Sequence, residues 1–389
     1  MTHAHPRATP SLLRQMHARQ VLAALQQNGP MSRADLTRHT GISGPTVTRT
    51  VSDLLEANLL EEGEPQQAAL GRPGKVLRLA STTVAVLGIV VAPECCEIVS
   101  AGLDGQIHAG ATHQLATPAR YPDLVAALAD DAERLIEQSK PTVLGVGVSV
   151  PGLLNRREKR TMVSPNLHQM DGRQLGDDLA RRLGLDVTLL QESHALCLAE
   201  RTYGAARGVA DFAMLDISSG LGLGVVHHGQ IISGHNGLAG ELGHLTVELH
   251  GKQCGCGNHG CLETVATDTA LAAAVSERVG RKLSIDDVVR LVHADELRAE
   301  DLFERVLQYL AVGLAAVINI FNPSKLFVYG RFLDADASLS ERLVELTRSR
   351  ALAPSMADCD IIRARGNKRL GAVAGIIDRL TTGRDDPLE

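Results

Sequence analysis

The sequence is poor in aromatic residues and has no long apolar run. Its 389 residues include no Trp, and aromatic side chains make up only 2% of the chain. The cores must therefore be built from Leu, Val, Ala and Ile, which suffices because 44% of the residues are hydrophobic. With 22% charged residues, the composition is that of a soluble globular protein. No apolar run approaches the ~20 residues that cross a bilayer, so we expect no membrane segment.

The N-terminal segment and the cysteines indicate a cytoplasmic protein. MTHAHPRATPSLLRQ lacks the apolar stretch of a signal peptide, so we expect no secretory signal. Three of the seven cysteines stand close together, which indicates a reducing compartment rather than a disulfide framework. The other four are expected to be small buried residues: Cys95, Cys96, Cys197 and Cys359.

Charge is distributed unevenly along the chain. Residues 1–80 carry nine Lys and Arg against six Asp and Glu, a net charge of +3. The remainder carries 30 against 39, a net charge of -9. A basic N-terminal segment on an acidic body favours contact with nucleic acid by the first segment only.

Residues 11–57 show three helical patterns separated by turn residues. The second helix begins at Ser32, which forms a capping-box-like start with Asp35, and it ends before a glycine turn. The third helix covers residues 44 to about 57 and has its apolar residues on one face. A short helix, a glycine turn and a helix with a polar start form the helix-turn-helix arrangement.

A hairpin follows these helices. Strands at 59–62 and 76–79 flank a long tip, which predicts the wing of a winged helix. Val47 and Val51 must face inward, which leaves the polar side chains of the third helix for the DNA groove. An Arg on the stiff Gly/Pro loop of the wing suits a narrow minor groove. We predict DNA contact by Ser43, Thr46, Thr48, Arg49 and Arg72. A helical protein-binding or dimerising module is the alternative for residues 11–80.

From residue 84 onward, apolar strands alternate with amphipathic helices, which predicts an α/β fold. In the first unit we expect strands at 84–91, 97–101, 106–109, 143–150 and 187–190, and helices at 121–139 and 193–203. A second unit begins near Gly204, with strands at 212–217 and 325–329 and helices at about 267–280, 284–294 and 299–321. The run from Gly220 to Gly224 is expected to be a turn, and a last helix is expected at 370–380.

The segment from Ala239 to Glu263 concentrates residues with metal-binding chemistry. Cys254, Cys256 and Cys261 stand between glycines, and His244 precedes them by ten residues. Thiolates and imidazole suit tetrahedral zinc, and four such ligands form a closed structural site. Accidental proximity of three thiols is the alternative, against which stand the four suitable ligands and the turn-forming glycines.

The same segment resembles the signature of the ROK family, which comprises repressors and sugar kinases. The signature is Glu-x-Gly-His, then Cys-x-Cys-Gly-x-x-Gly-Cys-x-Glu, beginning here at Glu241 and Cys254. The resemblance implies that His244 and the three cysteines bind Zn²⁺, and that Glu241, His244 and Glu263 face a sugar. It covers almost the entire chain. It implies a winged helix-turn-helix followed by a two-lobed actin-like (ribonuclease H-like) sugar-kinase fold.

Two further segments resemble the sugar site of this family. Asn166, in the run Ser-Pro-Asn-Leu, matches an Asn that contacts a sugar hydroxyl. Gln191 and Glu192 stand where the kinases carry an Asn and the Asp that serves as general base. Both changes keep the functional group and add one methylene. A polar cap at a helix N-terminus is the alternative for these two residues.

The nucleotide motifs of the family's kinases are degenerate in this chain. The kinases open their first lobe with Asp-x-Gly-Gly-Thr, whereas residues 88–94 read GIVVAPE. Bulky Val and a Pro without N–H cannot form a phosphate nest. The Gly-Gly pair near the adenosine site is Gly330-Arg331 here. We therefore expect no catalytic residue, with Glu192 a degenerate base, and no kinase activity.

These observations predict a sugar-responsive DNA-binding transcriptional regulator of the cytoplasm, a repressor of carbohydrate-utilisation genes. Its partners would be operator DNA and a monosaccharide or sugar derivative, and paired half-sites imply a homodimer or homotetramer. The expected domains are 1–80, 81–203 joined by 370–389, and 204–369. One alternative is an active sugar kinase with a DNA-binding head, against which the missing phosphate motif stands. Another is a partner of sugar phosphates or phosphotransferase proteins whose head binds protein.

Overall fold

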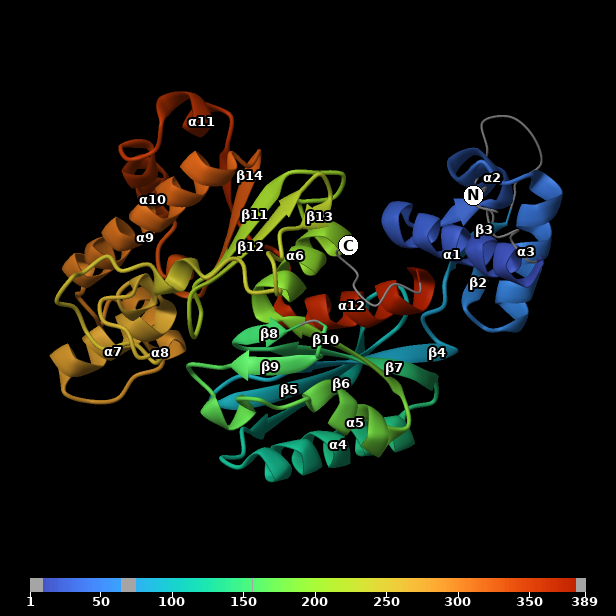
Figure 1. Cartoon of the computed structure of the whole chain (residues 1–389), viewed down its shortest axis with the longest axis horizontal. Coiled ribbons are helices and arrows are strands. Elements are labelled where there is room, and N and C mark those ends of the chain that lie inside the picture. The colour runs from blue at the N-terminus through green and yellow to red at the C-terminus, as the bar shows by residue number, and fades with distance from the viewer. Residues whose placement is uncertain (1–9, 64–74, 156, 383–389) are drawn as a thin grey trace, which may run out of the picture.

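The computed structural model describes residues 10–63, 75–155 and 157–382. Its N-terminal part is a winged helix-turn-helix, here called the head (Figure 1). Its helices are α1 (Pro10–Asn28), α2 (Arg33–Thr40) and α3 (Gly44–Glu56). Its strands are β1 (Met31–Ser32), β2 (Leu60–Gly63) and β3 (Val76–Leu79), in the order β1-β3-β2. The predicted capping box is confirmed, because Ser32 and Asp35 each bond the other's backbone N–H through their side chains.

The first lobe is a five-stranded sheet covered on both faces (Figure 1). Its strands lie in the order β10-β7-β4-β5-β6 and are β4 (Val84–Val90), β5 (Cys95–Ala101), β6 (Ile107–Ala116), β7 (Thr142–Val150) and β10 (Asp186–Gln191). Helices α4 (Tyr121–Gln138) and α5 (Leu175–Leu183) cover one face. A small hairpin, β8 (Leu153–Asn155) and β9 (Arg160–Val163), and the 3₁₀ turn η1 (His168–Met170) follow β7. The other face is covered by α6 (Glu192–Tyr203) and by α12 (Lys368–Thr382).

The second lobe repeats the sheet of the first. Its strands lie in the order β13-β12-β11-β14-β15 and are β11 (Phe212–Asp216), β12 (Gly222–His227), β13 (Gln230–Ile231), β14 (Lys325–Tyr329) and β15 (Asp360–Arg363). Taken in chain order, the first three strands of each sheet are antiparallel to their neighbours, and the fourth and fifth strands run parallel to the first. The helices are α7 (Asp268–Val279), α8 (Ile285–His293), α9 (Glu300–Phe321), α10 (Ser338–Arg348) and α11 (Ala353–Ala357), with 3₁₀ turns η2 (Leu242–His244), η3 (Leu262–Thr264) and η4 (Phe332–Asp334). The predicted α/β fold with two similar lobes is thus confirmed.

Helix α12 packs on the first lobe and also contacts the head (Figure 1). Val373, Ile376 and Ile377 of α12 lie fully buried in one continuous apolar cluster with Val21 and Leu25 of α1. The head therefore shares its hydrophobic core with the last helix of the chain. At the end of the same contact, the Thr381 hydroxyl lies 3.1 Å from the side-chain oxygen of Gln26 and 2.9 Å from the carbonyl oxygen of Ile377, and it can donate its one proton to either.

Three sequence-based expectations need correction. Most of the run Gly220–Gly224 is strand β12 rather than a turn, and its glycines serve close packing. A Cβ at Gly224 would lie 2.5 Å from the Sγ of Cys197 on α6. Strand β6 continues to Ala116, beyond the expected end at residue 109. The half-buried Cys95 is less enclosed than expected, whereas the other three isolated cysteines are buried.

Helix α9 also departs from the expectation that no segment could cross a membrane. By length and composition alone it passes the test for a span, with a mean hydropathy of 1.4. Most of its apolar side chains, including Phe303, Leu310 and Ile318, are buried in the core of the second lobe, whereas Ile320 near its end is exposed. This burial accounts for its hydropathy.

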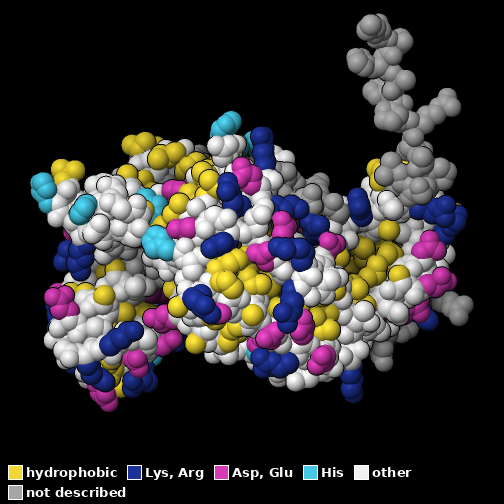
Figure 2. Space-filling view, turned by 60° about the horizontal axis from the view of Figure 1, so that its bottom comes forward, with side chains coloured by type: hydrophobic (Ala, Val, Ile, Leu, Met, Phe, Trp, Pro, Cys, Tyr) yellow, Lys and Arg dark blue, Asp and Glu magenta, His cyan; other side chains and the backbone are white. Residues whose placement is uncertain are grey.

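The surface of the molecule carries charges of both signs. On the face shown in Figure 2, acidic and basic side chains are interspersed. Ion pairs at the surface include Arg278–Asp301 and Arg342–Glu304.

Candidate functional site

A pocket lies where the two lobes meet, and we call it the inter-lobe pocket. Gln191 ends β10 and Asp216 ends β11, so the pocket opens beyond the C-terminal ends of parallel strands. Sheets of α/β proteins commonly bind ligands at this edge. The pocket brings together all six side chains for which sugar contact is expected: Asn166, Gln191, Glu192, Glu241, His244 and Glu263.

Side chains from both lobes meet inside the inter-lobe pocket. Gln191 Nε2 donates to Glu241 Oε1 at 3.4 Å, which links the first lobe to the second. Burial raises the pKa of Glu241, and the nearby His244 opposes this shift. A Cβ at Gly220 would lie only 3.0 Å from the Asn166 amide nitrogen and 3.1 Å from a Glu263 oxygen. A side chain at residue 220 would therefore press on both of these polar groups.

Ser193 is a pocket residue that the sequence did not single out as a ligand contact. It follows Glu192 in the first turn of α6 and lines the inter-lobe pocket. Its Oγ is buried and has no hydrogen-bond partner within the described ranges. A buried hydroxyl without a partner is costly, so a polar ligand in the pocket would satisfy it.

The Glu192 side chain is held by Lys368, a residue that no sequence pattern marks as part of the site. Lys368 Nζ lies 2.6 Å from Glu192 Oε1, 2.8 Å from Asp216 Oδ2 and 3.0 Å from Ser218 Oγ. Burial alone would lower the pKa of Lys368, but Asp216 and Glu192 outweigh it and raise that pKa above its ordinary value. Burial raises the pKa of Glu192, against the attraction of Lys368. We call these three ionisable side chains, Glu192, Lys368 and Asp216, the Lys368 cluster.

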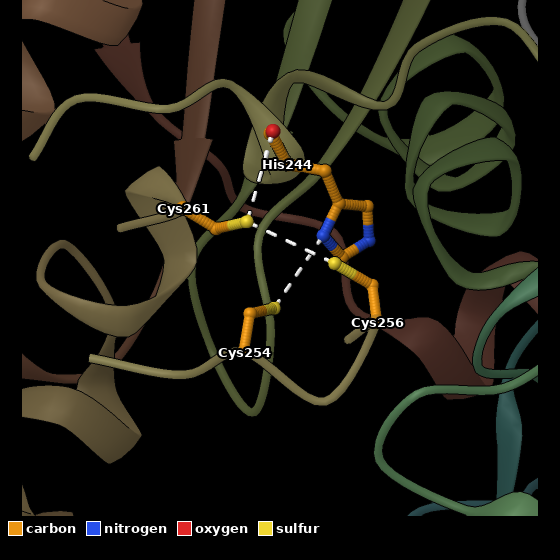
Figure 3. Close-up of side chains that lie close together, drawn as sticks. All are labelled: His244, Cys254, Cys256 and Cys261. Atoms are coloured by element: carbon orange, nitrogen blue, oxygen red, sulfur yellow. Dashed lines mark hydrogen bonds between the residues drawn. The ribbon is translucent and has the colours of Figure 1, made fainter. Parts of the chain in front are cut away.

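The four predicted metal ligands converge in a loop beside the inter-lobe pocket (Figure 3). One ligand atom from each of His244, Cys254, Cys256 and Cys261 lies within 4.8 Å of all the others. Cys256 and Cys261 have their Sγ atoms 3.8 Å apart, and Cys254 Sγ lies 3.7 Å from His244 Nδ1. A zinc ion with bonds of ~2.3 Å to sulfur has tetrahedral edges of about this length. The residues therefore fit a four-coordinate metal ion.

Glycines let the loop fold around the four ligands. Gly260 has a φ of 68°, and a Cβ there would lie 1.6 Å from the carbonyl oxygen of Glu248. The bridge between Thr246 and Cys261 holds the third cysteine against the segment that follows His244. Cys254 and Cys261 are buried, whereas Cys256 is exposed. The backbone conformation at residue 260 therefore requires Gly, and it lets the loop turn so that its four ligand atoms lie close together.

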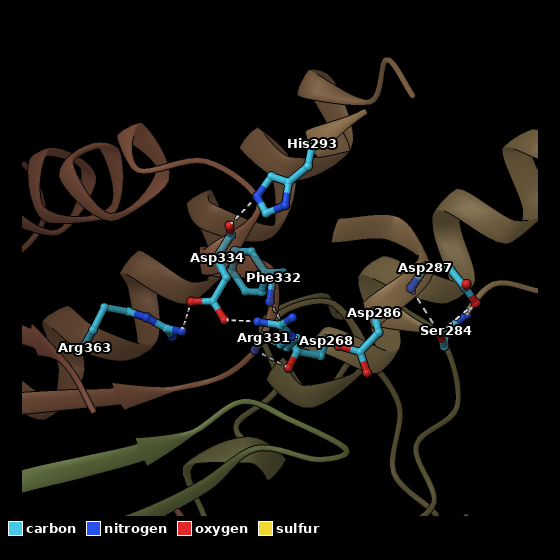
Figure 4. Close-up of polar contacts among 9 residues, drawn as sticks. All are labelled: Asp268, Ser284, Asp286, Asp287, His293, Arg331, Phe332, Asp334 and Arg363. Atoms are coloured by element: carbon cyan, nitrogen blue, oxygen red, sulfur yellow. Dashed lines mark hydrogen bonds and ion pairs between the residues drawn. The ribbon is translucent and has the colours of Figure 1, made fainter. Parts of the chain in front are cut away.

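Gly330 and Arg331, where the resemblance to the kinases leads to the expectation of a Gly-Gly pair, make contacts within the second lobe. Arg331 pairs through Nε with Asp286 at 2.7 Å and through its guanidinium with Asp334 at 2.6 Å (Figure 4). Its backbone N–H donates to Asp268 at 2.6 Å. The neighbouring Gly330 is required for packing, since a Cβ would lie 2.3 Å from the Ile217 side chain. The Arg331 side chain is thus committed to acidic groups of its own lobe.

The residues predicted for DNA contact lie at the start of α3. Ser43, Thr48 and Arg49 are exposed and Thr46 is half-buried, whereas Val47 and Val51 are buried as expected. The hydroxyls of Ser43 and Thr46 lie 2.8 Å apart, so one donates to the other. Arg49 forms no ion pair with any residue that the structure describes. The predicted wing residue Arg72 lies outside the described residues.

Two family models match the chain. The model described as the ROK family matches residues 96–378, and the model described as the MarR family matches residues 14–68. The first match covers most of the chain: the first lobe without β4, the second lobe, and α12 as far as Asp378. The second coincides with the helices of the head.

Known proteins resemble the chain over most of its length. A xylose repressor of Bacillus spizizenii is 27% identical over 330 residues, which are 84% of this chain and 85% of the repressor. The DNA-binding transcriptional dual regulator NagC of Escherichia coli is 24% identical over 380 residues, 93% and 92% of the two chains. A crystal structure of a ROK family transcriptional regulator, described as a homologue of the E. coli MLC protein, superposes with a TM-score of 0.79. That match has 26% identity and covers 95% and 97% of the two chains.

Proposed function

The chain belongs to the ROK family, and we propose that it is a transcriptional repressor whose binding to operator DNA responds to a sugar. The effector would be a monosaccharide or sugar derivative held in the inter-lobe pocket, and the regulated genes would serve carbohydrate use. Similarity to a xylose repressor and to NagC over most of both chains supports this function. The head, with its exposed polar residues on α3, supplies the surface for DNA.

One observation carries the proposal. A single pocket gathers six polar side chains from both lobes, in the same chain as a winged helix whose core includes α12. Carboxylate, amide and imidazole groups at this density suit the hydroxyls of a sugar. The unpartnered hydroxyl of Ser193 adds a further group that a sugar hydroxyl would satisfy.

We propose that the chain does not act as a sugar kinase. A general base must accept a proton from the attacking hydroxyl, but Glu192 is occupied by Lys368 at 2.6 Å. After β4 the chain continues as Val91, which is fully buried, then Ala92 and Pro93, so the usual phosphate nest has no counterpart there. Arg331 fills the place of the second adenosine-site glycine and is held by two ion pairs.

The metal ion in the loop of His244 and the three cysteines is proposed to be a structural Zn²⁺. Four ligands leave no open coordination position, which separates a structural site from a catalytic one. When bound, zinc would fix the loop that carries Glu241, His244 and Glu263 into the inter-lobe pocket.

The organisation of the protein is proposed as follows. The head comprises residues 1–80, the first lobe 81–203 with 370–389, and the second lobe 204–369. A homodimer or homotetramer would bind two operator half-sites in the cytoplasm.

The proposal is tested by titrating DNA from the promoter beside the gene with the full chain at fixed salt concentration. The titration is repeated with a panel of monosaccharides, after a thermal-shift screen has selected those that raise the melting temperature. We expect at least one sugar to stabilise the protein and to change operator affinity at least tenfold. When an Arg of the head such as Arg49 is changed to Ala, Arg134→Ala on α4 of the first lobe serves as the control, because it removes the same charge outside the head.

Three results would contradict the proposal. Sugar-dependent consumption of ATP in a coupled assay would establish the kinase alternative. Absence of DNA binding by the full chain at low salt would favour a head that binds protein. Operator binding that no sugar or sugar derivative alters would remove the effector role of the inter-lobe pocket.

A further inference from the structure

The charges around the inter-lobe pocket restrict the chemical class of its ligand. Its lining includes four carboxyl groups, those of Glu192, Asp216, Glu241 and Glu263. No Lys or Arg is among the lining residues in the part of the chain that the structure describes. The remaining ionisable lining residue is His244, whose Nδ1 faces the cysteines. A ligand in this pocket therefore meets hydrogen-bond acceptors and negative charge.

The nearest cation, Lys368, has no donor left for a ligand. An ammonium group has three N–H donors. Lys368 Nζ has three acceptors within reach, namely Glu192 at 2.6 Å, Asp216 at 2.8 Å and Ser218 at 3.0 Å. Its side chain is only 10% exposed, so it cannot turn outward to meet an anion. Two carboxylates around one ammonium also leave the Lys368 cluster with a net negative charge.

We infer that the effector is an uncharged monosaccharide and that phosphorylated sugars are excluded. Sugar hydroxyls donate to carboxylates, so the acceptor-rich lining suits a neutral polyol. A phosphate dianion needs donors and opposite charge, and it would instead be placed beside carboxylates in a partly buried site, where repulsion is poorly screened. This inference rests on the proposed sugar-responsive function and narrows its ligand.

Calorimetric titration of the full chain tests the inference with pairs that differ only in the phosphate. Suitable pairs are glucose with glucose 6-phosphate and N-acetylglucosamine with its 6-phosphate. For any pair that binds, we expect the parent sugar to bind at least 100-fold more tightly. Glu192→Gln removes one negative charge at constant shape and leaves Lys368 paired with Asp216 alone. We expect this variant to narrow the ratio of the two affinities at least tenfold, because the Lys368 cluster loses its net negative charge.

The outcomes of this test are distinct from those of the proposed function. If the protein binds a sugar phosphate more tightly than the parent sugar, and operator binding responds to that phosphate, the inference of an uncharged effector is overturned. The proposed function as a sugar-responsive repressor would still stand. An operator affinity that no sugar and no sugar phosphate alters would remove the proposed function and this inference with it. If Glu192→Gln unfolds, as thermal melting would reveal, the ratios measured on the wild-type protein still decide.

Helix α12 connects the surroundings of the inter-lobe pocket to the head. Lys368 is the first residue of α12 and contacts Glu192 of the first lobe and Asp216 of the second. At the other end of the helix, the Thr381 hydroxyl lies within hydrogen-bond distance of Gln26 of α1, at 3.1 Å. A helix of 15 residues spans about 22 Å, so one rigid element extends from the inter-lobe pocket to the head.

Helix α12 packs so closely against the first lobe that it has no room to deform locally. A Cβ at Gly147 would lie 1.8 Å from the carbonyl oxygen of Ala372, and a Cβ at Gly371 would lie 2.0 Å from that of Ala195. Because backbone lies on backbone, a displacement at Lys368 moves the helix as a unit. We infer that Lys368 is a positioning residue that transmits the separation of the two lobes through α12 to α1. Ligand binding can act in this way only if it favours one lobe arrangement over the other.

Lys368→Met tests this role, with Arg369→Gln as the matched control. Arg369 is the next residue on α12, but its pair with Glu97 at 3.4 Å stays within the first lobe. For Lys368→Met we expect operator affinity without sugar to stay within about threefold of wild type and the sugar-induced change to fall below twofold. Arg369→Gln should keep the full response. Sugar affinity measured by calorimetry separates loss of transmission from loss of binding.

A second variant protects the test against misfolding. Thr381→Val removes the hydroxyl that bonds Gln26 while keeping the shape of the side chain. We expect a sugar response reduced at least threefold with unchanged sugar affinity. A full sugar response in a folded Lys368→Met protein, or in Thr381→Val if the first variant does not fold, would overturn the transmission role.

Discussion

Nε2 of His244 lies 3.6 Å from Oε2 of Glu241, while Nδ1 of the same ring lies 3.7 Å from the Sγ of Cys254. One imidazole therefore stands between the metal-ligand loop and the inter-lobe pocket. A metal ion that holds Nδ1 also fixes the direction of Nε2, because the ring is planar and rigid. The loop and the pocket are consequently expected to respond together when a cysteine is changed.

Cys256→Ser is expected to lower metal content, stability and sugar response together. Metal analysis of wild-type protein should give close to one zinc per chain, and the variant should have markedly less, because Ser is a poor zinc ligand. Cys359→Ser is the control, since Cys359 is buried in the core of the second lobe and takes no part in the metal-ligand cluster. Metal-free wild-type protein with normal folding and sugar response would contradict a structural zinc.

Glu241→Gln is expected to separate sugar response from DNA binding. The change keeps the shape and removes charge-assisted hydrogen bonds, each worth roughly 1.5–3 kcal/mol. Operator affinity without sugar should equal that of wild type, and added sugar should no longer change it. Glu248→Gln is a suitable control, because Glu248 bonds Tyr309 and Arg305 outside the pocket. A normal response in Glu241→Gln would place the sugar elsewhere.

Arg49→Ala is expected to weaken operator binding by about 1–3 kcal/mol if the guanidinium reads a base edge. Arg49 is exposed on α3, so its removal should leave the melting temperature nearly unchanged. Titration should be made with the operator and with unrelated DNA, since loss of a base contact lowers the ratio of the two affinities. Equal affinity of wild type and variant for the operator would exclude Arg49 from the interface.

Acid should weaken the attachment of the head to the first lobe through Glu61. Burial opposes ionisation of this residue, but the N–H groups of Thr82 and Ser81 outweigh it and lower the pKa of Glu61 from 4.5 to about 2. A pKa lower in the folded protein stabilises the fold above pH 4.5, and this contribution is lost as pH falls toward 2.

Glu61→Gln is the variant that tests this pH dependence. It is expected to destabilise the protein by about 1–2 kcal/mol at pH 7, because the charged acceptor of these N–H bonds is lost. Its difference from wild type should shrink when melts are recorded at pH 4 and pH 3. A difference that stays constant over this range would assign the effect to packing rather than to ionisation.

Local patterns sufficed for much of the fold, whereas the six pocket residues were predicted from the resemblance to the ROK family. The capping box at Ser32, the buried face of α3 and the Cys-rich loop are each set by neighbours in the chain, so sequence spacing predicts them. Lys368 could not be predicted in this way. Its partners Glu192 and Asp216 are more than 150 positions away, and no local pattern marks a lysine at the start of a helix as buried.

Strand β12 shows that a local pattern can also predict the wrong element. Gly222 and Gly224 are turn formers by local propensity, so the sequence predicts a turn. Their actual role is to admit α6, since a Cβ at Gly224 would meet the side chain of Cys197. Such a requirement depends on a helix that packs from another part of the chain, and only the assembled fold reveals it.

The core shared by the head and α12 has a consequence for synthesis. The ribosome makes the head first, but the side chains of Val373, Ile376 and Ile377 that complete its core are among the last to be made. A chain interrupted before α12 therefore carries the residues proposed to contact DNA on a head whose core is incomplete. Nascent and truncated chains are thus expected not to occupy the operator, so that DNA binding begins only when the sugar-sensing part is also complete.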